Sequence, residues 1–318
     1  MGRAGHLNAM NESTIGSAHV PVLLEEVLQA LRPQAGGRYL DCTVGGGGHA
    51  AALLRASAPD GVVLGCDADP EAIAGVRARL PDDRLILRQA WLDEVAELAR
   101  ALGMIAFDGI LIDLGLSSDQ LAAPERGFSF MHEGPLDMRF DRSQGLPAWQ
   151  LIEQMDVQRL SEVLRAYGDV PNARQVAEAI WRARPITTTS QLRDVVTSVV
   201  RARSKRIHPA TQVFQALRIA VNDELVRLQS ALPALIDLLK PGGRIAVIAF
   251  HSAEDRIVKE IFRRASRAQA GFGQAEHEPA RLRLLTKTPI RPSEAEIARN
   301  PRARSARLRV AERLEVTT

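Results

Sequence analysis

The sequence predicts an α/β protein with a parallel sheet that helices cover on both faces. Four short, wholly apolar runs alternate with helix-forming segments in the first 115 residues, which is typical of strands buried in such a sheet. After Gly115 the alternation stops, and a long helical region separates these runs from another strand of the same kind. Because ligands of open α/β sheets bind beyond the carboxyl ends of the strands, a binding site is expected there.

The first half of the chain supplies a helix and then four strands. From Val20 to Leu31 the apolar residues recur at helical spacing. Strands are predicted at 39–42, 62–67, 84–91 and 108–115. Helix-forming segments connect them, and one of these has Pro70 in its first turn. The second strand ends on Asp67 and the fourth carries Asp113 at its carboxyl end, so both acids are expected at the ligand-binding edge.

The second half is mainly helical until the sheet pattern returns. Apolar stripes with helical spacing lie at 157–167, 173–181 and 192–200. Thr188 and Gln191 fit a capping box before the third stripe, and Ser252 and Asp255 resemble a cap beside His251. One long helical stretch is expected over 210–239, followed by strands at 244–250, 281–288 and 306–312. The predicted division is therefore an α/β domain in two parts, 1–123 and 223–318, with a helical domain inserted at 124–222.

Length and composition agree with two hydrophobic cores in an ordinary globular protein. The 318 residues exceed the size at which one core usually stops growing, and 46% are hydrophobic while 25% are charged. The longest apolar runs fall far short of the roughly 18 residues that suggest a membrane span. The N-terminus lacks the apolar segment of a signal peptide, so a cytoplasmic protein without a membrane partner is expected.

The two cysteines bear on whether a metal site is present, and the clusters of basic residues bear on the kind of partner. Cys42 and Cys66 have no metal-ligand spacing to the histidines, so both are interpreted as small buried hydrophobes and no metal site is expected. The net charge is only +3, but arginines gather at 201–206 and at 299–309. Clustered positive charge indicates a polyanionic partner, whereas a solvated surface explains each cluster equally well.

The glycine run in L-D-C-T-V-G-G-G-G-H-A lies between a predicted strand and a predicted helix, where bare backbone approaches a ligand. Gly45, Gly47 and Ala50 satisfy G-x-G-x-x-G/A, with Asp67 near the spacing of an acid that binds ribose hydroxyls. A nicotinamide nucleotide therefore fits the pattern. Asp41, immediately before the loop, would repel a pyrophosphate and attract an ammonium or sulfonium group, and S-adenosylmethionine carries both cations without a phosphate.

Eight segments resemble the ribosomal RNA small subunit methyltransferase H family, also called MraW. They include H-V-P-V-L-L-E-E-V, L-D-C-T-V-G-G-G-G-H, D-G-I-L-I-D-L-G-L-S-S-D-Q-L and F-H-S-A-E-D-R-I-V-K, and they run in order from His19 almost to the C-terminus. The resemblance implies a class I S-adenosylmethionine-dependent methyltransferase domain, Rossmann-like, with an inserted helical domain. The implied activity is N4-methylation of a cytidine in 16S ribosomal RNA of the small ribosomal subunit.

The resemblance also implies a set of site residues. The cofactor site of the family falls on Gly47, Gly48, His49, Asp67, Trp91, Asp113 and Gln120. The backbone of the glycines would face the methionine part, Asp67 would bind the ribose hydroxyls, and Trp91 would stack near the adenine. Asp113 is the candidate catalytic residue, because it would border the cofactor and accept a hydrogen bond from the amine. The enzyme's main task would be to hold the poor amine nucleophile in line.

The target cytidine has to be reached outside a stacked duplex, in single-stranded or flipped form. Phe128, Phe130 and the segment 201–206 are candidate RNA contacts, although phenylalanines in such a pattern more often belong to a core. Two other functions stay open. A nicotinamide-dependent oxidoreductase would use the glycine loop but tolerate Asp41, and a non-catalytic RNA-binding protein would use the basic segments alone.

Overall fold

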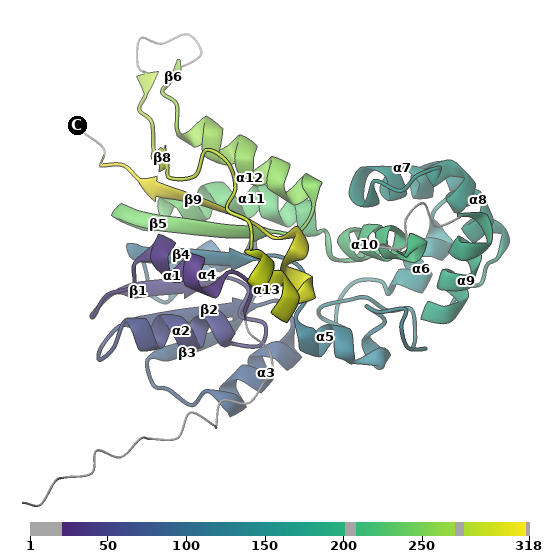
Figure 1. The fold of residues 1–318 in the computed structure, drawn as a ribbon, viewed down its shortest axis with the longest axis horizontal. Helices are drawn as coiled ribbons and strands as arrows, with labels where there is room; N and C mark the ends of the chain where they lie inside the picture. The colour runs from purple at the N-terminus through teal and green to yellow at the C-terminus, as the bar shows by residue number, and fades with distance from the viewer. Residues whose placement is uncertain (1–20, 201–207, 271–276, 316–318) are drawn as a thin grey trace, which may run out of the picture.

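A seven-stranded sheet forms the centre of the molecule, in the order β3-β2-β1-β4-β5-β9-β8 (Figure 1). The computed structural model describes residues 21–200, 208–270 and 277–315. The strands of this sheet are β1 Arg38–Asp41, β2 Val62–Asp67, β3 Leu85–Gln89, β4 Phe107–Asp113, β5 Leu239–Ala249, β8 Leu282–Leu284 and β9 Arg307–Arg313. β6 Gln269–Ala270 and β7 His277–Glu278 form a separate pair. All the predicted strands are present, so the α/β fold class is confirmed.

The sheet is mixed, which corrects the prediction of a parallel sheet. β1 to β5 are parallel to one another, whereas β9 pairs antiparallel with β5, with Ile245 opposite Ala311, and also antiparallel with β8. Four consecutive residues of β9 are buried, as in a parallel strand with both faces covered. An apolar run gives the burial of a strand but not its direction, so the sequence pattern could not show the reversal.

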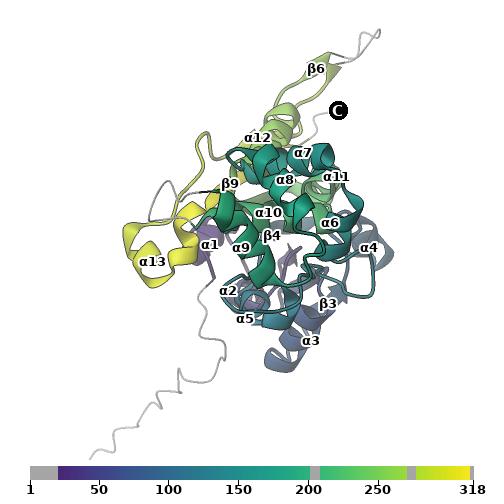
Figure 2. The ribbon, with the colours of Figure 1, turned by 90° about the vertical axis from the view of Figure 1, so that its right-hand side faces the viewer.

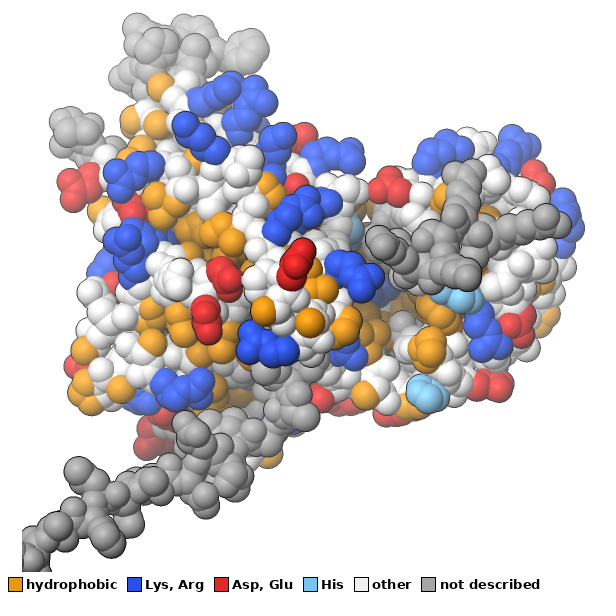
Figure 3. Space-filling model, viewed as in Figure 1, with side chains coloured by type: hydrophobic (Ala, Val, Ile, Leu, Met, Phe, Trp, Pro, Cys, Tyr) orange, Lys and Arg blue, Asp and Glu red, His pale blue; other side chains and the backbone are white. Residues whose placement is uncertain are grey.

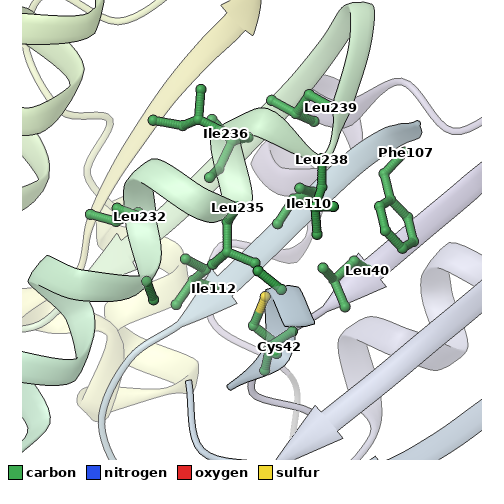
Figure 4. Close-up of a cluster of buried hydrophobic side chains, with 14 of the residues drawn as sticks. Leu40, Cys42, Phe107, Ile110, Ile112, Leu232, Leu235, Ile236, Leu238 and Leu239 are labelled. Carbon is green, nitrogen blue, oxygen red and sulfur yellow. The ribbon is translucent and has the colours of Figure 1, made fainter. Parts of the chain in front are cut away.

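Helices cover both faces of the sheet. One face packs on α1 Leu24–Leu31, α2 Gly48–Ala56, α3 Pro70–Arg79 and the 3-10 helix η2 Pro301–Ser305, which follows α13 Glu294–Arg299. The other face packs on α4 Val95–Ala101, α11 Glu224–Asp237 and α12 Ser252–Ala265. In Figure 4, Leu232, Leu235 and Ile236 of α11 lie over Ile110 and Ile112 of β4. Cys42 and Cys66 are both buried in this second core, as expected.

The predicted helical stretch over 210–239 is present, and it consists of two helices. α10 Pro209–Asn222 ends where Asp223 adopts the left-handed conformation, with φ of 52°, and α11 starts at the next residue. Aspartate tolerates this conformation better than most residues. The buried ion pair between Arg218 and Glu224, with Nε–Oε1 at 2.8 Å, joins the two helices across the break. The apolar period continues through the break, which is why the sequence pattern did not reveal it.

The two predicted caps have different outcomes. Thr188 and Gln191 form a capping box at the start of α9, as expected. At the start of α12 the cap is His251, and its box partner is Glu254 rather than Asp255. Asp255 instead accepts from Arg309 Nε of β9 at 2.6 Å. The prediction for Asp255 was wrong because its strand partner lies far away in the sequence.

A third hydrophobic core lies outside the sheet layers, in the region predicted to be helical. It is built by α6 Ala148–Gln154, α7 Val157–Gly168, α8 Ala173–Arg182, α9 Thr189–Val199 and α10. The buried members of this core run from Phe128 to Leu217. Figures 1 and 2 show these helices beyond one end of the sheet, over neither of its faces. We propose that 124–222 is an inserted domain with its own core, with 1–123 and 223–318 forming the α/β domain.

Replacing Leu164 by alanine is expected to loosen the inserted domain selectively. Leu164 is fully buried in the third core, and a buried leucine-to-alanine change costs about 2–5 kcal/mol. Hydrogen exchange of the amides should show lost protection in α7, α8 and α10 but unchanged protection in β1 and β4. Equal loss in both regions would contradict the proposed division.

Among the described residues, no helix is long and apolar enough to cross a membrane.

Candidate active site

A pocket opens at the carboxyl ends of β1, β2 and β4, as expected for this type of sheet. Its wall combines the glycine loop, the residues that follow β2, β3 and β4, and residues from the inserted region. Six of the seven predicted site residues line it: Gly48, His49, Asp67, Trp91, Asp113 and Gln120. Gly47 does not line the pocket. The fold therefore brings most of the predicted site together at one place.

The glycines of the loop have different structural roles. Gly45 and Gly47 have φ values of +48° and +84°, which favour glycine. A Cβ on Gly47 would lie 3.1 Å from Val76 of α3, so this residue supports the loop from behind. A Cβ on Gly46 would meet no other atom within 4 Å, and Gly46 lines the pocket. Gly46 therefore leaves bare backbone facing the pocket, while Gly47 sets the turn.

Asp67 holds the loop and also faces the pocket. The Gly45 N–H donates to its Oδ2 and the Asp69 N–H to its Oδ1, both at 2.9 Å. Burial raises the pKa of Asp67 to about 6, although these two backbone hydrogen bonds oppose the shift. Each carboxylate oxygen can accept more than one hydrogen bond. The ionised side chain can therefore still accept from hydroxyl groups of a ligand.

Asp41, His49 and Asp113 form a buried charged cluster beside the loop. His49 Nε2 lies 3.5 Å from Asp113 Oδ2. Burial disfavours a charged imidazole, but the hydrogen bond to Asp113 and the charges of Asp113 and Asp41 outweigh it and raise the pKa of His49. Burial raises the pKa of Asp41 to about 7. Asp41 is buried and does not line the pocket, whereas Asp113 does, so only the carboxylate of Asp113 borders the space that a ligand could occupy.

Two buried carboxylate oxygens of this cluster have no hydrogen-bond partner within the described part of the chain, Asp41 Oδ2 and Asp113 Oδ1. Buried polar atoms are usually satisfied. The Asp113 backbone is fixed, because its N–H donates to Thr43 Oγ1 at 2.7 Å. Asp113 therefore borders the pocket with a partly exposed carboxylate, of which one buried oxygen has no partner.

Trp91 and Gln120 are held by protein contacts. The Arg227 guanidinium lies 4.2 Å from the centroid of the Trp91 ring and so covers one ring face. Gln120 is buried in α5 Ser118–Ala122, where it completes a capping box with Ser117, and its Nε2 donates to Asp69 Oδ2 at 2.9 Å. Trp91 thus offers an aromatic wall, whereas Gln120 mainly supports the residues around it.

Arg126 is a buried arginine that pairs with one buried and one exposed carboxylate, and the sequence did not reveal this. Only 2% exposed, it lies at the end of the 3-10 helix η1 Pro124–Arg126. Its Nη2 is 2.9 Å from Asp69 Oδ2 and its Nη1 is 2.9 Å from Glu71 Oε2. Nη2 also donates to the carbonyl of Phe140 at 2.9 Å. Arg126 therefore ties the start of α3 to the segment that brings Phe140 to the pocket.

The chain also contributes pocket residues where it returns from the inserted region. Asn222, Glu224, Arg227 and Phe250 line the pocket together with Phe140. Asn222 accepts from the Phe140 N–H at 2.9 Å and donates to the carbonyl of Met138 at 2.8 Å. These residues were missed as site residues. Phe250 belongs to a segment that carries the family resemblance, but only the folded chain shows that these residues reach the pocket.

The candidate RNA contacts have different outcomes. Phe128 is 5% exposed and belongs to the third core, which is the alternative that the sequence pattern favoured over an RNA contact. Phe130 is half-buried and packs on Phe214 and His208, with ring centroids 5.1 Å and 4.8 Å away. The basic segment 201–206 lies outside the described residues.

Sequence comparisons find related proteins that match almost the whole chain. The MraW methylase family has a model that matches residues 16–314. A protein of Thermomicrobium roseum named ribosomal RNA small subunit methyltransferase H is 52% identical over 314 residues, covering 95% of this chain and 96% of that protein. Proteins of the same name from Magnetococcus marinus and Citrifermentans bemidjiense are each 48% identical, covering 93% of this chain and 98% of those proteins.

Proposed function

Because this chain belongs to the MraW methylase family, we propose that it is a ribosomal RNA methyltransferase that methylates N4 of a cytidine in 16S ribosomal RNA of the small subunit. The observation that carries the proposal is the carboxylate of Asp113, a hydrogen-bond acceptor that lines the pocket at the carboxyl end of β4 with 23% of its side chain exposed. The amine of cytosine is a hydrogen-bond donor that this acceptor suits. The names of the relatives support ribosomal RNA as the substrate.

S-adenosylmethionine is the expected cofactor, and the pocket residues suit it. Asp67 has acceptor capacity for ribose hydroxyls, Trp91 offers an aromatic wall for adenine, and Gly46 exposes backbone without a side chain. The carboxylate of Asp113 suits a ligand with positive charge and disfavours a pyrophosphate. This disfavours the nicotinamide alternative. When bound, the cofactor supplies a methyl group already activated on a sulfonium.

In this proposal the protein's own residues position the amine. Asp113 accepts a hydrogen bond from it and so directs its lone pair, which is the in-line positioning that such a transfer needs. His49, 3.5 Å from Asp113, holds that carboxylate in place from behind. Asp41 supports the positive charge of His49, because the charge of its carboxylate favours the protonated imidazole.

Methyl transfer from labelled S-adenosylmethionine to 30S subunits lacking the modification tests the function, with nucleoside analysis of the product. Label in N4-methylcytidine is the expected result. Label in another nucleoside would support a ribosomal RNA methyltransferase but reject N4 of cytidine as the methylated atom. RNA binding without any transfer would favour the non-catalytic alternative, and hydride transfer with a nicotinamide nucleotide would favour the oxidoreductase.

Affinity for S-adenosylmethionine is expected to fall as the pH drops through about 6, because protonated Asp67 loses acceptor capacity for the ribose. The pKa of Asp67 is raised to about 6 by burial, so below this pH the affinity should fall about tenfold per pH unit. The same raised pKa means that ionisation of Asp67 costs folding stability as the pH rises from 3.8 to about 6. Isothermal titration calorimetry at pH 5 to 8 measures the affinity.

The matched variants for this titration are D67N and D41N. D67N should bind weakly and without this pH dependence. Asp41 titrates near pH 7 but does not line the pocket, so D41N should keep the fall below pH 6. If D67N keeps the fall in affinity for S-adenosylmethionine below pH 6, a titrating group other than Asp67 causes it.

A further inference from the structure

Helix α12 carries a stripe of positive charge on a side that is turned away from the core. The buried members of this helix are Glu254, Val258 and Phe262. Arg256, Lys259 and Arg263 are exposed, and at 100° per residue their mean direction is about 130° from that of the buried three. Arg267, also exposed, follows two residues after the helix end. We call these four cations the α12 stripe.

The α12 stripe is distinguished from nearby arginines by its lack of acidic partners. Within 21–200, 208–270 and 277–315, none of its four side chains forms an ion pair. By contrast, three nearby arginines have acidic partners: Arg281, just before β8, pairs with Asp237. Arg283 of β8 pairs with Glu312, and Arg309 of β9 pairs with Asp255. Like charges three and four residues apart destabilise a helix. The folded chain therefore keeps four like charges here without a direct ion pair, with the exposed Glu260 as the one acid among them in the helix, and a polyanion would compensate the remaining charge.

The position of α12 links this charge to the pocket. Its N-cap, His251, directly follows Phe250, which lines the pocket. The helix has 14 residues, about 21 Å in length. Its far end reaches a second cavity that includes Arg264, Arg267 and Arg281 in its wall. In Figure 3, Lys and Arg side chains gather over the surface where Figure 1 places α12.

We propose that the α12 stripe binds the phosphate backbone of the RNA segment next to the target nucleotide. This inference rests on the proposed function, because it takes RNA as the polyanion. Contacts to phosphates give affinity that depends on salt and fix the position of a nucleic acid without reading its sequence. A helix that starts at the pocket and carries cations outward suits a strand whose target base enters the pocket.

The test compares two variants that each lose four positive charges. The stripe variant is R256Q/K259Q/R263Q/R267Q. The matched control is R38Q/R55Q/R77Q/R100Q, in which exposed arginines of β1, α2, α3 and α4 are replaced. Binding to unmodified 30S subunits is measured at several salt concentrations, with calorimetric binding of S-adenosylmethionine as the check on the folded pocket.

The stripe variant should bind 30S subunits roughly 10- to 100-fold more weakly than the control variant, and its plot of log affinity against log salt should be shallower by about 3. Affinity for S-adenosylmethionine should not change. Equal weakening in both variants would overturn the proposal, because net charge alone would then explain it. If the stripe variant keeps its 30S binding but loses binding to anionic phospholipid vesicles, the proposal is also overturned, and a membrane surface is the partner of the stripe.

The outcome separates this inference from the function on which it rests. The unaltered enzyme could prove to transfer no methyl group to 30S RNA while the stripe variant still loses 30S binding. This result would support RNA binding by the stripe and reject the proposed activity. Full methyl transfer by the stripe variant, with unchanged KM for 30S subunits, would reject the stripe and leave the activity standing.

Discussion

Replacing Arg126 by methionine is expected to lower the free energy of unfolding by about 3–5 kcal/mol. The change removes the cation between Asp69 and Glu71 and leaves Asp69, which is 1% exposed, as a buried charge without its partner. It also frees the carbonyl of Phe140. Urea denaturation followed by circular dichroism gives the difference from the unaltered chain.

The matched control for R126M is R159M. Arg159 pairs with Glu162 at 3.5 Å on the exposed surface of α7, and such pairs contribute about 0.3–0.5 kcal/mol. The double variant D69N/R126M should recover part of the loss, because it removes the charge that R126M leaves unpaired. A loss in R126M as small as that in R159M would show that the ion pairs of Arg126 add little stability.

The second large effect is expected for D113N, which should lower the rate of methyl transfer about 100-fold or more at saturating S-adenosylmethionine. The amide keeps the size of the side chain but loses the charge that pairs with His49, and it can present its NH₂ group where Asp113 has an acceptor oxygen. Single-turnover transfer to 30S subunits measures the step without product release.

D119N is the matched control for D113N. Asp119 also lines the pocket, but its side chain is 60% exposed and its ion pair is with Arg79. Its variant should therefore transfer methyl groups at nearly the original rate. Full turnover in D113N with unchanged affinity for S-adenosylmethionine would reject the positioning role of Asp113.

The sequence predicted local features of the fold well because those features depend on neighbours in the chain. The strand ending on Asp67, the helix starting at Pro70 and the capping box of Thr188 all follow from residues within a few positions. The location of Asp67 and Asp113 at one pocket also followed, since the carboxyl ends of parallel strands meet at the same edge.

Features that depend on distant contacts could not be predicted. Arg126 reads as an ordinary surface arginine until the fold buries it between α3 and the segment at Phe140. The direction of β9 and the partner of Asp255 both depend on pairing across the sheet. Asn222 reaches the pocket only because the chain returns there after the inserted region. Each of these contacts joins residues far apart in the sequence.

The order of strands in the sheet has a consequence for how the chain is made. β5 pairs on one side with β4, but its other neighbour, β9, is the last element of the described chain. During synthesis, one edge of β5 therefore stays open until residues 307–313 have been added. An open apolar edge pairs readily with other chains, so the growing polypeptide is most exposed to aggregation in the interval between these two strands. A nonsense mutation before Arg307 would make that exposure permanent.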